Sequence, residues 1–242
     1  MNIALHRIID LSTDHHSKDS DYQYNDNHHC PFAIENMNRE NFFRKFDKVV
    51  AEFGEEKPSL LLHSCCGPCS SSVIELLAKY FSVTVLWYNP NLYPEAEYEK
   101  RLATQKQLIE AIDKDGSHAE LVVEDWRSED YFSRIKGLEN EPEEGKRCVE
   151  CFRIRLEETA RIAAERGFEW ICTTLTMSSR KDAVVINAIG REVAAEYGVK
   201  WLPSEFRKRE GNHRSIILSE KYGLYRQEYC GCVFSMNGKV GG

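Results

Sequence analysis

The residues best suited to do chemistry are the nine cysteines of this 242-residue chain. Cys30 and Cys172 stand alone, and the other seven fall into three tight groups. The groups are Cys65, Cys66 and Cys69; Cys148 and Cys151; and Cys230 and Cys232. In a reducing compartment, metal binding and redox chemistry are commoner uses of cysteine than structural disulfides. The grouping therefore predicts one of these two uses.

The first group lies at the junction of two predicted elements. The apolar run at 59–62 has the character of a buried strand, and Gly67-Pro68 followed by small residues is typical of a turn and a helix start. We expect the cysteines on this turn, at the carboxyl end of a strand, where open α/β sheets bind ligands. Consecutive Cα atoms lie only about 3.8 Å apart, which is short for a disulfide between Cys65 and Cys66.

The second group opens a predicted helix. Cys148 and Cys151 are three residues apart at the start of a helical pattern over 148–166, so both sulfurs project to one side near the positive end of that helix. This position is expected to lower the thiol pKa. With Cys65 and Cys66 they provide four thiolates, the number that a [4Fe–4S] cluster or a tetrahedral zinc requires. An adjacent Cys-Cys pair is unusual for zinc, so the pattern favours the cluster.

The remaining cysteines near the site are Cys69, Cys230 and Cys232. Three uses are open for them: a second metal, a redox-active pair, or buried core thiols. A disulfide across Cys-Gly-Cys would be strained, which favours a metal. His63 is interpreted as a hydrogen-bonded core histidine and Cys172 as an inert buried thiol.

The elements that must position these groups alternate between strands and helices. Helical patterns cover 38–53, 71–79, 94–112, 129–135, 148–166 and 182–197, and strands are predicted at 59–62, 83–88, 121–123 and 169–175. This order predicts an α/β fold with a mainly parallel, Rossmann-like sheet and flanking helices. Residues 1–36 are polar and aperiodic, so we expect a flexible N-terminal arm. Residues 37–242 are predicted to form a single α/β catalytic domain, whose cysteine-containing tail after Pro203 lacks a clear period.

Composition limits the partners that this chain can have. The net charge of −7 argues against a protein that coats nucleic acid. No run approaches the roughly 18 apolar residues of a membrane span, and the N-terminus lacks the apolar core of a signal peptide, so we expect a cytoplasmic protein. Residues 200–226 nevertheless carry a balance of +4, and Lys208, Arg209 and Arg214 are candidates for contact with a nucleic-acid backbone. Hydroxyl side chains with Arg180 and Lys181 in 173–181 suit a phosphate or ribose.

Several linked motifs resemble those of a known family. They are Cys65-Cys66-Gly67-Pro68-Cys69; Tyr88-Asn89-Pro90-Asn91 with Tyr93-Pro94; Cys148 with Cys151; Thr173-Thr174-Leu175; and a tail with Arg214-Ser215, then Leu224-Tyr225-Arg226-Gln227-Glu228-Tyr229-Cys230-Gly231-Cys232-Val233-Phe234-Ser235. In combination, over residues 58–235, they resemble the epoxyqueuosine reductase QueH family.

The resemblance implies an oxidoreductase that reduces epoxyqueuosine at the wobble position of tRNA to queuosine, the final step of queuosine biosynthesis. It implies a fold related to the HUP and adenine nucleotide α-hydrolase group, and an external electron donor. It also implies a [4Fe–4S] cluster ligated by Cys65, Cys66, Cys148 and Cys151. A second, mononuclear iron would be held by Cys69, Cys230 and Cys232, which would then be the catalytic residues. Cysteines stand where a glycine-rich nucleotide loop would be, so ATP is not expected as a cofactor.

Two other functions fit the same residues. One is a zinc-stabilised RNA-binding protein without catalysis. The other is a thiol–disulfide reductase that uses Cys230 and Cys232. Bound iron and sulfide would distinguish the reductase of epoxyqueuosine from the first, and activity without iron would identify the second.

Overall fold

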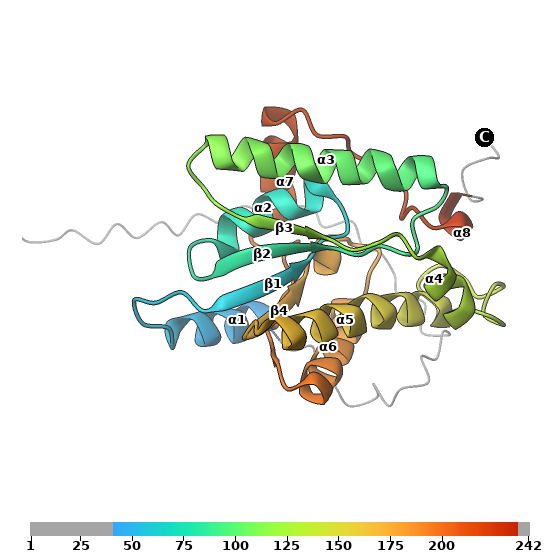
Figure 1. Ribbon diagram of the computed structural model, residues 1–242, viewed down its shortest axis with the longest axis horizontal. Coiled ribbons are helices and arrows are strands. Elements are labelled where there is room, and N and C mark those ends of the chain that lie inside the picture. The colour runs from blue at the N-terminus through green and yellow to red at the C-terminus, as the bar shows by residue number, and fades with distance from the viewer. Residues whose placement is uncertain (1–40, 237–242) are drawn as a thin grey trace, which may run out of the picture.

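A parallel sheet forms the centre of the molecule. The computed structural model describes residues 41–236, and the predicted arm at 1–36 lies outside them. Five strands pair in the order β3-β2-β1-β4-β5, all parallel (Figure 1). The strands are β1 (Ser59–His63), β2 (Ser82–Trp87), β3 (Glu120–Val123), β4 (Trp170–Thr173) and β5 (Lys200–Trp201). The predicted Rossmann-like α/β fold is confirmed.

Helices cover both faces of this sheet. They are α1 (Phe42–Ala51), α2 (Gly67–Leu77), α3 (Glu95–Lys114), α4 (Ser128–Arg134), α5 (Lys146–Arg166), α6 (Ala183–Tyr197), α7 (Gly211–Lys221) and α8 (Val233–Met236), with a 3₁₀ turn η1 (Thr174–Met177) after β4. Helices α5 and α6 lie on one face, and α2 and α3 lie on the other (Figure 1). Their buried side chains belong to two separate core clusters. Successive residues of β1 follow this division, because Leu61 joins the first core whereas Leu60 and Leu62 join the second.

The helix after the first cysteines begins earlier than the sequence pattern indicates. It starts at Gly67 rather than Ser71, with Pro68 in its first turn. Cys66 is the N-cap, and its sulfur accepts the backbone N–H of Cys69 at 3.3 Å. The expectation that all three cysteines lie on a turn is therefore wrong for Cys69, which belongs to the first helical turn. A cysteine is an uncommon N-cap, so the usual capping signal was missing.

The chain after Pro203 contains more regular structure than its pattern indicates. The sequence reading missed β5, which has only two residues, and also α7 and α8. Helix α7 packs on α2 with Ser215 and Ser219 buried in addition to Leu218, and the Ser215 hydroxyl donates to the Pro68 carbonyl at 2.7 Å. Small polar residues in the contact hide the apolar period on which a helix prediction depends.

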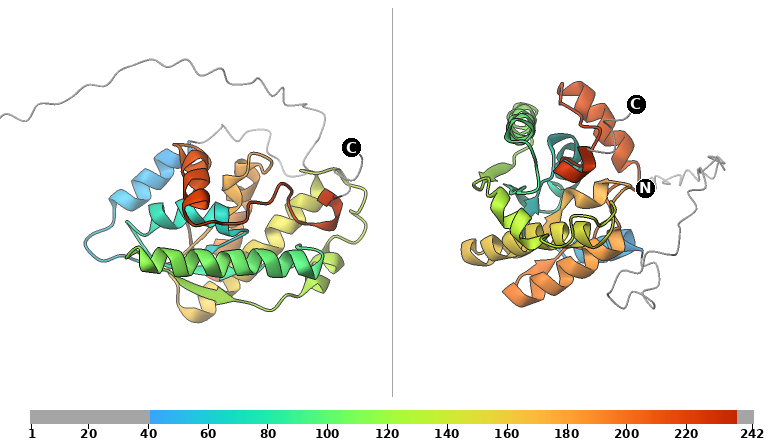
Figure 2. Two further views of the ribbon diagram at one scale, coloured as in Figure 1. Left: turned by 90° about the horizontal axis from the view of Figure 1, so that it is seen from above. Right: turned by 90° about the vertical axis from the view of Figure 1, so that its right-hand side faces the viewer.

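The segment after α7 returns across the molecule to the end of the sheet where α4 and α5 begin (Figures 1 and 2). It places the last cysteine pair beside the two earlier groups. Within residues 41–236, no helix combines the length and apolar character needed to span a bilayer.

Candidate metal centre

All three cysteine groups meet at the carboxyl ends of the strands. A cavity of about 570 Å³ opens there. Six cysteines line it: Cys65, Cys69, Cys148, Cys151, Cys230 and Cys232. The seventh, Cys66, is buried next to Cys65. All seven are free thiols. Their positions around one cavity agree with the expectation that the three groups share a site.

The group on β1 and α2 is the most compact. The sulfurs of Cys65, Cys66 and Cys69 lie within 4.8 Å of one another. Among residues 41–236, these three side chains are close enough together to ligate one metal ion. Thr174, the first residue of η1, contacts Cys65 through two hydrogen bonds. Its Oγ1 accepts the Cys65 N–H at 3.0 Å and donates to the Cys65 sulfur at 3.3 Å. The Thr174 hydroxyl thus orients the Cys65 sulfur before any metal binds.

Hydrogen bonds within this group give the three thiols different pKa values. Hydrogen bonds from Cys66 and Cys69 hold the pKa of Cys65 well below its usual value. Burial, followed by the hydrogen bond to Cys65, raises the pKa of Cys66 to about 12. The hydrogen bond to Cys65 also raises the pKa of Cys69. Cys65 is therefore the most acidic of the three thiols, and a metal that binds all three must displace the protons that the sulfurs still hold.

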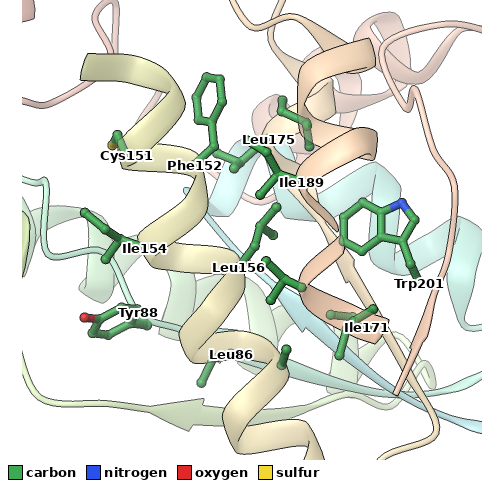
Figure 3. Packing of buried hydrophobic residues seen from close by; sticks show 14 of the residues in the cluster. Leu86, Tyr88, Cys151, Phe152, Ile154, Leu156, Ile171, Leu175, Ile189 and Trp201 are labelled. Atoms are coloured by element: carbon green, nitrogen blue, oxygen red, sulfur yellow. The ribbon is translucent and has the colours of Figure 1, made fainter. Parts of the chain in front are cut away.

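The second group lies in the first turns of α5. Cys148 accepts the backbone N–H of Glu144 at 3.3 Å. Cys151 is buried at the end of the core in which Phe152 and Leu156 pack near Leu175 and Ile189 (Figure 3). Burial raises the pKa of both thiols, that of Cys151 to about 12. The expectation that the helix start would lower these pKa values is wrong, because the loss of water outweighs the field of the helix end.

Arg101 fastens the third group in place. This side chain of α3 is buried, and its guanidinium donates to the carbonyls of Cys230 and Tyr229 at 2.9 and 3.2 Å. The Tyr93 N–H donates to the Gly231 carbonyl at 2.9 Å. A hydrogen bond from Cys232 lowers the pKa of Cys230 and raises that of Cys232. The tail is thus held at three successive residues.

Gly231 supplies the conformation that this attachment needs. Its φ is +102°, and an added Cβ would lie 2.5 Å from Leu92 Cδ2 and 2.6 Å from Arg101 Nη1. We expect Gly231→Ala to detach the tail, because it combines a strained backbone, worth about 1–3 kcal/mol, with a collision at the anchoring arginine. Alkylation of Cys230 and Cys232 in metal-free protein, followed by mass spectrometry, should become faster.

The matched control for this variant is Gly167→Ala. Gly167 also has a positive φ, +76°, but an added Cβ would meet nothing within 4 Å. It should lower thermal stability and leave alkylation of the tail unchanged. Equal alkylation rates in the Gly231 variant and the unchanged protein would show that the tail does not depend on this glycine.

Two cations, the buried Arg155 and the half-buried Lys181, face the thiols without carboxylate partners among the described residues. Arg155 is only 2% exposed, and it donates to the Cys151 sulfur at 3.1 Å and to the Cys151 carbonyl at 2.8 Å. Burial alone would lower the pKa of Arg155. The electrostatic attraction of Cys151, Cys230 and Cys65 outweighs it, so the pKa of Arg155 is raised. The same balance, led by Cys230 and Cys65, raises the pKa of Lys181.

This donor set fits a metal–thiolate centre. Soft sulfur ligands select zinc, copper(I) and iron–sulfur clusters over hard cations. A buried guanidinium needs a compensating negative charge, and ligation converts the high-pKa thiols beside Arg155 into thiolates. Sequence reasoning missed Arg155 and Arg101, and the available signal for Arg155 was its place one helical turn after Cys151.

His63 and Cys172 lie in the core, as the sequence around each of them indicates. His63 is fully buried, with ring nitrogens 2.9 Å from Thr173 Oγ1 and 3.2 Å from the Tyr88 carbonyl. Burial, then the charge of Arg155, lowers its pKa to about 3, so the ring is neutral. Cys172 is also fully buried and contacts the Leu202 carbonyl at 3.6 Å. Both interpretations as core residues are confirmed.

The predicted nucleic-acid contacts divide between two places. Lys208 lines the cysteine cavity, together with Arg180 and Arg207. Arg209 and Arg214, with Lys208 at the border, line a second hollow of about 280 Å³ over α1 and α2. Arg209 forms a two-point ion pair with Asp47, and Arg214 forms one with Glu75. Their contact with a nucleic acid stays a prediction.

Comparison with known proteins gives one consistent result. Residues 60–238 match the family model described as epoxyqueuosine reductase QueH. Proteins of that name from three bacteria are similar to this chain. The Staphylococcus epidermidis protein is 37% identical over 200 residues, 81% of this chain and 84% of its own. The Haemophilus influenzae protein is 40% identical over 193 residues, 79% and 77% of the two chains. The Thermotoga maritima protein is 38% identical over 186 residues, 74% and 90%.

Proposed function

The chain belongs to the epoxyqueuosine reductase QueH family, and we propose that it reduces epoxyqueuosine in tRNA to queuosine through an iron–sulfur cluster and an adjacent iron. The observation that carries this proposal is the convergence of cysteines from three segments on one cavity: six line it, and the seventh, Cys66, is buried beside Cys65, with the buried Arg155 and the half-buried Lys181 facing the thiols. Conversion of the epoxide to an alkene consumes two electrons and two protons and releases the oxygen as water. The activity therefore requires an external reductant.

The proposed ligand sets follow the family resemblance. Cys65, Cys66, Cys148 and Cys151 would ligate the [4Fe–4S] cluster, and Cys69, Cys230 and Cys232 would hold the second iron. When bound, the cluster supplies electrons singly and the second iron supplies Lewis acidity for an oxygen ligand. The sulfur set supports this proposal because it exceeds what one four-ligand site requires.

The chain's own residues provide charge balance and placement for this chemistry. Arg155 and Lys181 offset the negative charge of thiolates in a region with little water. Arg101 fixes the tail that carries Cys230. His63 is neutral and is absent from the residues between 41 and 236 that line the cavity, so it is a poor candidate for the proton donor.

The direct test is conversion of the modified nucleoside. Protein reconstituted anaerobically with iron and sulfide is incubated with epoxyqueuosine-containing tRNA and a reductant, and the nucleosides are analysed by mass spectrometry. We expect queuosine to appear with loss of one oxygen. Colourless protein that binds zinc and tRNA but leaves epoxyqueuosine intact would instead support a zinc-stabilised RNA-binding protein. Conversion without iron would support a thiol–disulfide reductase.

The tRNA backbone is proposed to contact the basic residues Lys208, Arg209 and Arg214. We expect Lys208→Ala to lower the salt dependence of tRNA affinity by about one unit of log–log slope, the effect of one lost phosphate contact. Arg209→Ala and Arg214→Ala should have smaller effects, because Asp47 and Glu75 already neutralise these guanidinium groups. Lys208 is less fully neutralised, because its partner Glu205 also pairs with Arg207.

Affinity is measured by filter binding at several salt concentrations. The control is Arg161→Ala, because Arg161 pairs with Glu158 and Glu165 on α5 and lies outside the residues that line the cavity. If the slope and the affinity of the Lys208, Arg209 and Arg214 variants all match those of the Arg161 control, tRNA approaches by another surface.

A further inference from the structure

Three side-chain amides line the cysteine cavity without a part in the proposed metal sites. Asn89 and Asn91 follow the end of β2 directly, and Gln227 lies on the tail. Asn89 and Asn91 are each only 2% exposed. They therefore face the cavity from the sheet, whereas Gln227 faces it from the C-terminal segment that carries Cys230 and Cys232.

The oxygen of each of these amides is buried and has no hydrogen-bond partner among residues 41–236. The orientation of Asn89 is fixed, because its Nδ2 donates to the Ser64 carbonyl at 2.8 Å. Its Oδ1 is therefore the free atom. A buried acceptor without a donor costs about 1–3 kcal/mol, and such atoms are rare in folded proteins. Three in the wall of one cavity indicate a ligand that brings hydrogen-bond donors.

The two arginines at the cavity wall direct most of their donors elsewhere, whereas the Gln105 Nε2, close to Ser64, is a buried donor without a partner among residues 41–236. The Arg101 guanidinium donates to Glu97 and to the Tyr229 and Cys230 carbonyls. Two of the three nitrogens of Arg155 donate to Cys151. None of these donors pairs with the Asn89, Asn91 or Gln227 oxygen, so a bound molecule can supply the donors. The cavity volume of about 570 Å³ lies within the range for small-molecule and nucleoside-sized ligands.

A guanine-type base has the complementary edge. Its N1–H and exocyclic 2-amino group are adjacent donors, whereas adenine lacks both. Epoxyqueuosine carries a 7-deazaguanine ring, which keeps this edge unchanged. Single-stranded loop bases are usually recognised by such contacts after they are turned out of the stack.

We propose that Asn89, Asn91 and Gln227 accept hydrogen bonds from the N1–H and 2-amino groups of the substrate base and so select a guanine-type nucleoside. This inference rests on the proposed function, because it assigns the base of the same tRNA substrate to a defined part of the cavity. The three amides are specificity residues in this account, since they contact the unreactive edge of the base and leave the metal ligands unchanged.

The test compares two RNAs that differ by one amino group. Anticodon stem-loops with guanosine or inosine at the wobble position are titrated against the reconstituted protein, because inosine keeps N1–H and lacks the 2-amino group. We expect the unchanged protein to prefer guanosine by about tenfold, the value of one hydrogen bond to a buried acceptor. Asn91→Ala should bind both RNAs equally.

Two further variants keep the test decisive. Asn91→Asp retains an acceptor and should retain the preference, and Gln227→Leu should reduce it from the other side of the cavity. The control is Asn212→Ala, because Asn212 also lines the cavity but is exposed to solvent. Iron and sulfide content should be the same in all variants, which separates base recognition from damage to the metal centre.

The outcomes separate this inference from the proposed function. No preference in the unchanged protein, or a full preference in both Asn91→Ala and Gln227→Leu, overturns the base-recognition site. Equal loss of preference in Asn91→Asp and Asn91→Ala overturns the role of the acceptor atom. A clear guanosine preference in protein that cannot convert epoxyqueuosine overturns the proposed reduction and leaves the recognition site standing.

Discussion

Replacement of Cys151 by Ala is expected to abolish both the metal centre and the reductase activity. The Cys151 sulfur accepts a hydrogen bond from Arg155 at 3.1 Å, and both side chains are buried. The substitution removes a proposed cluster ligand and the sulfur that accepts a hydrogen bond from a buried guanidinium, a loss of about 1–3 kcal/mol for a buried donor left without its acceptor. Iron and sulfide content, absorbance near 400 nm and turnover should all fall to background after reconstitution.

Cys172→Ala is the matched control for this variant. Cys172 is fully buried, and burial raises its pKa to about 12, as it does for Cys151. It lies outside the residues that line the cavity among those described, on β4. Its substitution should cost only about 1 kcal/mol of packing and preserve iron and turnover. Normal iron and turnover in Cys151→Ala would remove Cys151 from the ligand set.

The sheet and its main helices could be predicted because their sequence signals are local. Leu60, Leu61 and Leu62 form a continuous apolar run, which is typical of a parallel strand covered on both faces. From Phe152 to Ala163, each turn of α5 places a buried apolar residue on the same face of the helix. The first two cysteine groups were also recognisable, because one follows a strand end and the other opens a helix, and those positions meet at one edge of a parallel sheet. The third group was recognisable only by the close spacing of Cys230 and Cys232.

The remaining features depend on contacts between distant parts of the chain. Arg101 binds the carbonyl of Cys230, which lies 129 residues later, and Arg209 pairs with Asp47, which lies 162 residues earlier. No sequence period encodes such pairs. The charge state of Cys151 was misjudged for the same reason, because its desolvation comes from the core around it rather than from its position in α5.

Distance alone groups the sulfurs differently from the proposed division between two metals. Cys69 lies within 4.8 Å of Cys65 and Cys66, although the family resemblance assigns it to the other set. Cys69 belongs to the first turn of α2, whereas Cys65 precedes that helix. The same helix start could therefore deliver sulfurs to two adjacent metals, and variants of the tail can distinguish this arrangement from a single centre.

Cys230→Ala combined with Cys232→Ala is expected to abolish turnover while the cluster absorbance remains. Both cysteines lie on the tail that Arg101 holds, separate from the helices that carry the proposed cluster ligands. Under the proposed ligand assignment, their removal should release the second iron and with it the Lewis acidity that this iron would supply to the epoxide oxygen. The measurements are iron and sulfide per chain, absorbance near 400 nm, and queuosine formation. Iron should fall by one per chain, and sulfide should stay constant.

Cys69→Ala and Cys148→Ala complete the comparison. If Cys69 ligates the second iron, its substitution should reproduce the tail variant, with sulfide retained and turnover lost. Cys148→Ala should lose sulfide and absorbance instead, because it removes a proposed cluster ligand on α5. Loss of absorbance in Cys69→Ala would move that sulfur into the cluster, in agreement with its short distances to Cys65 and Cys66. Full turnover in the double tail variant would contradict the two-metal mechanism, and it would exclude a thiol–disulfide reaction at Cys230 and Cys232 as well.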